Sequence, residues 1–286
     1  FPPEKSIETQ VKLGADFIVC LDECTSPLHD YAYTKAAMNR THDWEKRSVS
    51  AYKKYSTKYK TDQALFGVVQ GGPFQDLRIE SAKFNAKLDI FGMAIGGALV
   101  SKDKMHDILN WIIPIMPNDR PRHLFGIGTV DDIFEAVARG VDMFDCVIPT
   151  RLGRMGQVLI KVKSQSFDKT QDDPERSRTG QRSKVKSILN NEQEKAYKRD
   201  RFRLDITRSC FLTDQKPIDP DCGCYTCRNF TRGYLCHLFR ARELLAYRLA
   251  TIHNLYFMQN LMKSIRESIK NGKFMALKKS YLDFQS

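Results

Sequence analysis

Residues 65–72 read LFGVVQGG, a short apolar run that ends on a glutamine and two glycines. The run alternates weakly, if at all, between apolar and polar side chains, as strands buried on both faces do. A helical pattern follows it over residues 75–87. This unit of apolar run, loop and helix recurs along residues 16–150, and its repetition indicates the fold class.

Five runs of this kind lie in the first half of the chain, and they are rich in valine, isoleucine and phenylalanine. They cover residues 16–21, 65–69, 90–95, 122–127 and 143–148. Helical patterns lie between the runs at residues 31–59, 75–87, 102–115 and 130–139. Strands and helices in alternation predict a parallel sheet with right-handed crossovers.

Polar residues and glycines stand at the ends of these runs. The endings are Asp22-Glu23, Gln70-Gly71-Gly72, Gly96-Gly97, Gly126-Ile127-Gly128 and, inside the fifth run, Asp145. In a TIM (β/α)8 barrel the strand carboxyl ends converge on one mouth that holds the active site, so these endings favour an α/β fold of that class. An open doubly wound sheet is the alternative. Five units are visible where eight close a barrel, so we expect the first strands to be missing from this chain.

The charge of the chain is unevenly placed. The formal net charge is +12, of which residues 1–150 carry −2 and residues 151–286 carry +14. This asymmetry indicates a body joined to a surface that faces a polyanion, and a well-solvated basic surface is the equally weighted alternative. No apolar run reaches the length of a membrane span and no signal-peptide pattern is present. We therefore expect a cytoplasmic protein without a membrane partner.

Three cysteines lie within six residues, at Cys222, Cys224 and Cys227, and His253 follows 26 positions later. In an intracellular chain such a cluster indicates a metal site rather than disulfides. Three thiolates and one imidazole complete a tetrahedral set with no open position, which predicts one structural Zn²⁺ per chain. His237 is the rival fourth ligand, and a chance cluster around a core histidine is the remaining alternative.

The chain accordingly divides into three expected regions. These are a partial TIM barrel carrying the active site at residues 1–162, a polar insertion at residues 163–201, and a zinc-binding subdomain at residues 202–286. Two helices, at residues 239–269 and 273–284, are expected to close the chain.

Residues 142–154 read DMFDCVIPTRLGR and place Asp145 among apolar side chains. A carboxylate is costly there unless it is paired or used. It could attack a sugar C1′, because that carbon passes through an oxocarbenium-like state. Arg151 and Arg154 could hold nearby phosphates, or one of them could pair with a purely structural Asp145.

Asp22 and Gln70 offer acceptors and donors at neighbouring strand ends. A guanine-like base presents N1–H and N2–H₂ donors beside an O6 acceptor, and such a pair of side chains complements that edge. Gly96 and Gly97 would let the backbone approach the base closely.

Several strings of this sequence resemble a known family, the bacterial-type tRNA-guanine transglycosylases, or queuine tRNA-ribosyltransferases. The strings that carry the resemblance are LDECT (21–25), VQGG (69–72), AIGG (94–97), FGIG (125–128), FDCVIPTR (144–151), CGCYTC (222–227) and TIHNLYF (251–257). Their order and spacing agree across nearly the whole chain, apart from residues 163–201.

The resemblance implies a TIM barrel with a C-terminal zinc subdomain, in an enzyme that is often a homodimer. It implies exchange of guanine at the wobble position (34) of tRNA for a 7-deazaguanine, either preQ1 or queuine, in queuosine biosynthesis. Asp145 would be the nucleophile that holds the tRNA covalently. The incoming base would bind at Asp22, Gln70, Gly96 and Gly97, and the zinc at Cys222, Cys224, Cys227 and His253. The implied tRNA contacts are Gly126, Ile127, Gly128, Thr129, Val130, Asp131, Asp132, Thr150, Arg151, Leu152, Gly153 and Arg154.

The chain departs from the family pattern in two places. The family has a general acid/base aspartate in an early Ser-Asp stretch that is absent here, so we expect this chain alone to exchange bases poorly. Residues 98–100 read ALV where many relatives have LAV, which leaves preQ1 and queuine open as the incoming base. Phe125, where bacterial relatives often have methionine, could stack on the base.

Three other functions compete with this interpretation. They are a noncatalytic tRNA-binding partner subunit of the same fold, an archaeosine-type transglycosylase, and a zinc RNA-binding module on a barrel scaffold. Retention of Asp22, Gln70 and Asp145 disfavours the first and third. An archaeosine-type enzyme would normally add C-terminal RNA-binding domains, and this chain ends at Ser286.

Overall fold

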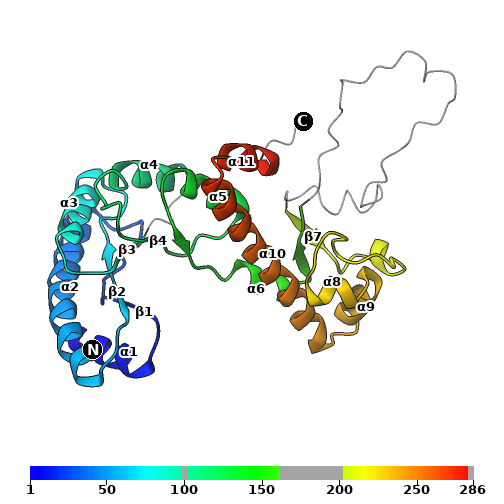
Figure 1. The fold of residues 1–286 in the computed structure, drawn as a ribbon, viewed down its shortest axis with the longest axis horizontal. Coiled ribbons are helices and arrows are strands. Elements are labelled where there is room, and N and C mark those ends of the chain that lie inside the picture. The colour runs from blue at the N-terminus through cyan, green and yellow to red at the C-terminus, as the bar shows by residue number, and fades with distance from the viewer. Residues whose placement is uncertain (98–101, 162–201, 283–286) are drawn as a thin grey trace, which may run out of the picture. The chain divides into compact units, whose positions relative to one another are not determined.

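The computed structural model describes residues 1–97, 102–161 and 202–282 (Figure 1). The chain divides into two compact units, Phe1–Cys146 and Val147–Ser286, and each has its own buried core. The predicted insertion at residues 163–201 and the loop at residues 98–100 lie outside the described residues. No helix in the described part of the chain has the length and apolar character needed to cross a membrane.

The first unit contains a parallel sheet whose five strands pair in chain order. The strands are β1 (Phe17–Val19), β2 (Ala64–Val69), β3 (Gly92–Ile95), β4 (Arg122–Leu124) and β5 (Met143–Phe144). A doubly wound sheet would reverse its strand order at a switch point, whereas a barrel adds each strand beside the last. The observed order therefore confirms the barrel prediction over the doubly wound alternative.

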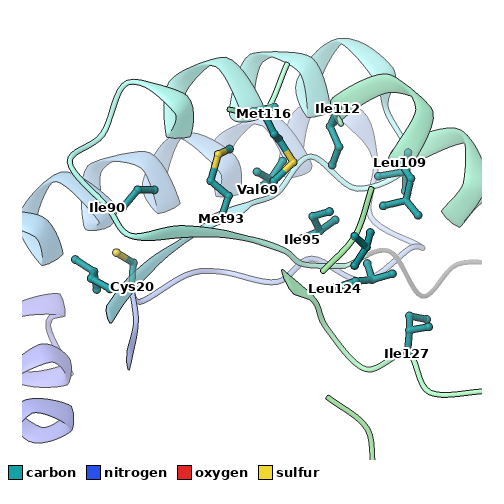
Figure 2. Close-up of a cluster of buried hydrophobic side chains, with 14 of the residues drawn as sticks. Cys20, Val69, Ile90, Met93, Ile95, Leu109, Ile112, Met116, Leu124 and Ile127 are labelled. Carbon is teal, nitrogen blue, oxygen red and sulfur yellow. The ribbon is translucent and has the colours of Figure 1, made fainter. Parts of the chain in front are cut away.

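Four crossover helices connect these strands, and one helix precedes them. They are α2 (Tyr31–Tyr59), α3 (Gln75–Ala86), α4 (Lys102–Ile112), α5 (Val130–Ala138) and the leading α1 (Pro3–Leu13). Between the sheet and its helices lies an apolar core. In Figure 2, Val69 and Met93 of the strands lie in this core with Met116, from the turn after α4. Because β2 is buried along five of its six residues, it has the continuous apolar pattern from which the sheet was predicted.

The strands are shorter than the predicted runs, and the fifth run is the clearest case. Asp145 lies one residue beyond β5 rather than inside a strand, and the run continues into a short helix, α6 (Ile148–Arg154). Pro149 occupies the first turn of α6, where its missing N–H costs no hydrogen bond. The prediction of one extended run over residues 143–148 was therefore wrong in its second half.

The second unit combines a two-stranded antiparallel sheet with helices. Its further elements are β6 (Gln157–Leu159), β7 (Arg203–Asp205), η2 (Ser209–Phe211), α8 (Tyr225–Asn229), α9 (Arg232–Arg240), α10 (Leu244–Lys270) and α11 (Phe274–Leu282). The predicted helix at 239–269 begins too early, because residues 239–240 end α9. Arg242, between α9 and α10, adopts a left-handed φ of 58°. No glycine or proline in the sequence indicates that a helix ends here.

Candidate active site and metal centre

The carboxyl edge of the parallel sheet collects the predicted site residues of the first unit. Gln70 follows β2 directly, Gly96 follows β3, and Asp145 follows β5. Asp22 comes three residues after β1, and Gly126 two residues after β4. Neighbouring parallel strands end at the same edge of the sheet, so the five loops that follow them present their residues at this carboxyl edge.

Asp22 and Gln70 are in direct contact at this edge. Gln70 Nε2 donates to Asp22 Oδ2 at 2.6 Å. Burial raises the pKa of Asp22, and the hydrogen bond from Gln70 opposes that shift. Gln70 is itself buried, and its Oε1 has no hydrogen-bond partner among the described residues. A buried acceptor without a partner is costly, so this amide is poised to accept a donor from a ligand.

Gly96 and Gly97 follow β3 and lie beside the Gln70 side chain. A Cβ atom on Gly96 would lie 2.6 Å from Gln70 Nε2 and would displace that side chain. Gly97 has a φ of +60°, in the left-handed region that favours glycine. The lack of a side chain at Gly96 therefore leaves the Gln70 amide its place, and Gly97 adopts a backbone conformation that other residues disfavour.

Arg78 of α3 links the ends of β2 and β3 by hydrogen bonds, and it was not predicted from the sequence. Its guanidinium is fully buried and donates to the carbonyl oxygens of Gly72, Val69, Gly96 and Gly97, at 2.7 to 3.0 Å. Burial lowers the pKa of Arg78 to about 10. The only signal in the sequence is a charged residue on the sheet-facing side of an amphipathic helix, which is too common to single out.

Asp145 has 59% of its side chain exposed and is held by two donors of the first unit. Its Oδ1 lies 3.0 Å from His123 Nε2 and 3.1 Å from the backbone nitrogen of Gly126. Its Oδ2 accepts no hydrogen bond from the described part of the chain. The carboxylate is thus fixed by one oxygen and open at the other. His123 was not predicted, because a lone histidine in a strand carries no distinctive pattern.

The residues of the two predicted tRNA-contacting segments differ in their exposure to solvent. In the segment after β4, Gly126 is exposed, whereas Ile127 and Gly128 are buried. Thr129 caps α5 by accepting a hydrogen bond from the backbone nitrogen of Asp132. In α6 the two arginines point to the surface of the second unit, and the two residues between them are buried. These are, in chain order, Arg151, Leu152, Gly153 and Arg154.

The predicted metal ligands meet in the second unit. The sulfur atoms of Cys222, Cys224 and Cys227 lie 3.7, 3.5 and 3.3 Å from His253 Nδ1. A tetrahedral site with Zn–S bonds of about 2.3 Å and Zn–N bonds of about 2.0 Å places sulfur and nitrogen roughly 3.5 Å apart. The donor set and its spacing therefore fit a zinc ion. His237, the rival ligand, is an exposed residue of α9 and is not part of this group.

Two adjacent residues of α10 hold this centre to its surroundings. His253 Nε2 donates to the carbonyl oxygen of Leu159 at 2.7 Å, which leaves the Nδ1 lone pair facing the three sulfur atoms. The next residue, Asn254, accepts from the Leu159 nitrogen at 2.8 Å and donates to the carbonyl oxygens of Pro149 and Gln157, both at 3.0 Å. The helix that carries His253 thereby also fixes β6 and α6, and α6 carries Arg151 and Arg154.

Comparison with known proteins finds one matching family model and several similar proteins. The family model for queuine tRNA-ribosyltransferase matches residues 1–286. A queuine tRNA-ribosyltransferase of Herpetosiphon aurantiacus is 42% identical over 284 residues, and one of Roseiflexus sp. (strain RS-1) is 41% identical over 290 residues. A relative of the same name from Streptococcus agalactiae is 36% identical over 283 residues.

These matches cover 98–99% of this chain but only part of each relative. The covered share is 61% of the Herpetosiphon protein, 64% of the Roseiflexus protein and 63% of the Streptococcus protein. The chain thus spans about three fifths of the length of the curated relatives it matches.

Proposed function

Because the chain belongs to the queuine tRNA-ribosyltransferase family, we propose that the protein exchanges the guanine at the wobble position of tRNA for a 7-deazaguanine base. The names of its relatives support a transfer of a base to tRNA ribose. The observation that carries the proposal is the gathering of Asp22, Gln70 and Asp145 at one edge of one parallel sheet.

The Asp22–Gln70 pair would recognise the base by its polar edge. The carboxylate of Asp22 accepts the N1–H and N2–H₂ donors of guanine, and these are the donors that preQ1 and queuine also carry. The second amide proton of Gln70 and the backbone beside Gly97 are available to the O6 acceptor. Since one pair of this kind matches the polar edge of one base, the outgoing and incoming bases would bind in turn.

Binding in turn requires a covalent intermediate, and Asp145 is the residue suited to form it. Its exposed carboxylate can reach a ribose that stays attached to a large RNA. In the first step an oxygen of Asp145 forms a bond to C1′ as the C1′–N9 bond breaks, and guanine leaves with the bonding pair and takes up a proton. In the second step N9 of the incoming base loses a proton and bonds to C1′, and the carboxylate departs.

The Cys222, Cys224, Cys227 and His253 centre would hold one zinc ion. Four protein ligands fill a tetrahedral shell, so the ion when bound cross-links α8, the loop before it and α10. These residues take no part in base exchange. Their contribution is to keep α10 in place and, through Asn254, the arginine-bearing α6.

The tRNA backbone would contact the basic half of the chain. Residues 151–286 carry a formal charge of +14, and Arg151 and Arg154 present guanidinium groups on the surface of α6. The loop that begins at Gly126 lies at the same sheet edge as Asp145. We assign phosphate and ribose contacts to residues 126–132 and 150–154.

Base exchange is tested with an in vitro transcribed tRNA and radiolabelled guanine. The full-length protein should incorporate label into a tRNA with guanine at the wobble position and not into one with adenine there. Unlabelled preQ1 and queuine, added separately, show which base chases the label out. No incorporation of guanine under any condition would refute the proposed function.

A further inference from the structure

We propose that His123 is a positioning residue for Asp145, which it holds by Oδ1 so that Oδ2 faces the ribose. The inference rests on the proposed function and goes beyond it, because it assigns the geometry of the nucleophile to a second side chain. It starts from one contact, the 3.0 Å approach of His123 Nε2 to Asp145 Oδ1.

The sheet register brings the two residues together. His123 of β4 pairs with Met143 of β5, and Leu124 pairs with Phe144. Side chains alternate along a strand, so His123 faces away from the core that buries Leu124. Asp145, two residues after Met143, returns to the face that Met143 and His123 share. The contact is therefore a product of strand pairing, across 22 positions of sequence.

The histidine ring is held in a defined orientation. Its centroid lies 4.8 Å from that of Phe125, at 66°, and 6.5 Å from that of Phe66, at 73°. Both are edge-on arrangements, and only 15% of the His123 side chain is exposed. An ionised carboxylate can only accept hydrogen bonds, so Nε2 carries the proton in this pair. The ring thus donates from a fixed place.

A second donor makes the arrangement selective for one oxygen. The backbone nitrogen of Gly126 also points to Oδ1, at 3.1 Å. Two donors on the same oxygen fix the torsion of the carboxylate and leave the lone pairs of Oδ2 directed elsewhere. The attacking atom is therefore Oδ2, and the free rotation that an exposed aspartate would otherwise have is removed before the substrate binds.

The two hydrogen bonds also bear on the second chemical step. When Oδ2 forms its bond to C1′, Asp145 becomes a neutral ester and its hydrogen bonds weaken. When the incoming base attacks C1′, the electron pair of the C1′–O bond returns to the Asp145 carboxylate. The hydrogen bonds from His123 and Gly126 to Oδ1 then strengthen again. His123 accordingly stabilises the departing carboxylate, so its removal should slow release of the adduct; formation of the adduct should slow because Oδ2 is no longer oriented.

The test compares His123→Phe with His123→Gln in the full-length protein. Phenylalanine keeps a ring between Phe66 and Phe125 but donates nothing, whereas the glutamine amide can place an N–H close to the position of Nε2. Misplacement of a reacting group by about 1 Å costs roughly 10²-fold in rate. We expect His123→Phe to exchange labelled guanine about 10- to 100-fold more slowly, with tRNA affinity and thermal stability close to wild type, and His123→Gln to recover most of that loss. His237→Phe, at an exposed histidine of the second unit, is the matched control and should behave as wild type.

The outcomes separate the inference from the proposed function. Exchange by the wild-type protein together with undiminished exchange by His123→Phe would overturn the inference and leave the function standing. The same holds if His123→Gln is as slow as His123→Phe, because the donor would then be irrelevant. No exchange by the wild-type protein would overturn both.

Discussion

Gln70 Nε2 and Asp22 Oδ2 lie 2.6 Å apart, so two side chains from consecutive strand ends are already joined where a base would bind. Gly96 has no side chain that would displace Gln70, and Arg78 holds the neighbouring backbone by donating a hydrogen bond to the carbonyl oxygen of Gly96. A site that is assembled in advance loses little side-chain entropy on binding, and each hydrogen bond to the base then contributes more fully to affinity.

Asp22→Asn should weaken recognition of the base. The variant keeps an acceptor for Gln70 but replaces the charged acceptor for two base N–H groups. Hydrogen bonds to a charged group contribute about 1.5–3 kcal/mol, so we expect the KM for guanine to rise roughly 10- to 100-fold. Asp16→Asn, at the exposed opposite end of β1, is the control and should leave the KM unchanged. Equal KM values for the two variants would remove Asp22 from the base site.

The purified protein should contain one zinc ion per chain. Cys224→Ser should lose the metal, because a hydroxyl is a poor zinc ligand, whereas His237→Ala should retain it. Chelation should lower the melting temperature, since the centre and Asn254 together hold β6 and α6. Metal analysis by mass spectrometry and thermal denaturation measure both effects. A Cys224→Ser variant with a full complement of zinc would contradict the assignment.

Glu45 of α2 should make the stability of the protein depend on pH. It is fully buried, accepts a 2.6 Å hydrogen bond from the nitrogen of Val68, and contacts Asn85 Nδ2 at 3.2 Å. Burial raises the pKa of Glu45 from 4.5 to about 8. Between pH 4.5 and 8 Glu45 therefore holds a proton in the folded protein that it has lost in the unfolded chain. Its contribution to the free energy of unfolding is complete below about pH 4.5 and is lost as the pH rises through about 8.

Glu45→Gln tests this by removing the charge while keeping the acceptor for Val68. The variant should melt at a higher temperature than wild type at pH 8.5, with a smaller difference at pH 6.5. Measurements stay at pH 6.5 and above, because burial of His42 lowers its pKa from 6.5 to about 4 and adds a slope of opposite sign below pH 6.5. Asp43→Asn, exposed on the same helix, should follow the wild-type profile. Parallel pH profiles for Glu45→Gln and wild type would mean that Glu45 stays ionised in the fold.

Binding to tRNA should weaken steeply as salt is added, because phosphate contacts release counterions. Arg151→Ala and Arg154→Ala should each reduce the slope of log K against log [salt] by about 1, if each arginine neutralises one phosphate. Neither change should affect the zinc content. Filter binding over a range of salt concentrations gives the slopes, and slopes equal to that of the wild-type protein would exclude α6 from the tRNA contact.

Much of the fold and of the candidate site could be predicted from the sequence, because local patterns carry them. The β2 run with its Gln-Gly-Gly ending predicts a buried strand and a loop, and the Cys222–Cys227 spacing predicts a metal site from three residues alone. His123 and Arg78 could not be found in this way. Their partners lie at strand ends, and only strand register and helix packing bring them there. The left-handed turn at Arg242 was missed for a similar reason, since no residue type at that position signals it.

Asp145 is the proposed nucleophile at C1′, and a denaturing gel of the full-length protein with tRNA tests this assignment. The wild-type protein should give a band shifted by one covalently bound tRNA, and excess 7-deazaguanine base should discharge it. Asp145→Asn should bind tRNA with nearly wild-type affinity in a native assay, and yet give no shifted band and no guanine exchange. A shifted band that persists in Asp145→Asn and disappears instead in Asp22→Asn would contradict this assignment, because it would make Asp22 the nucleophile.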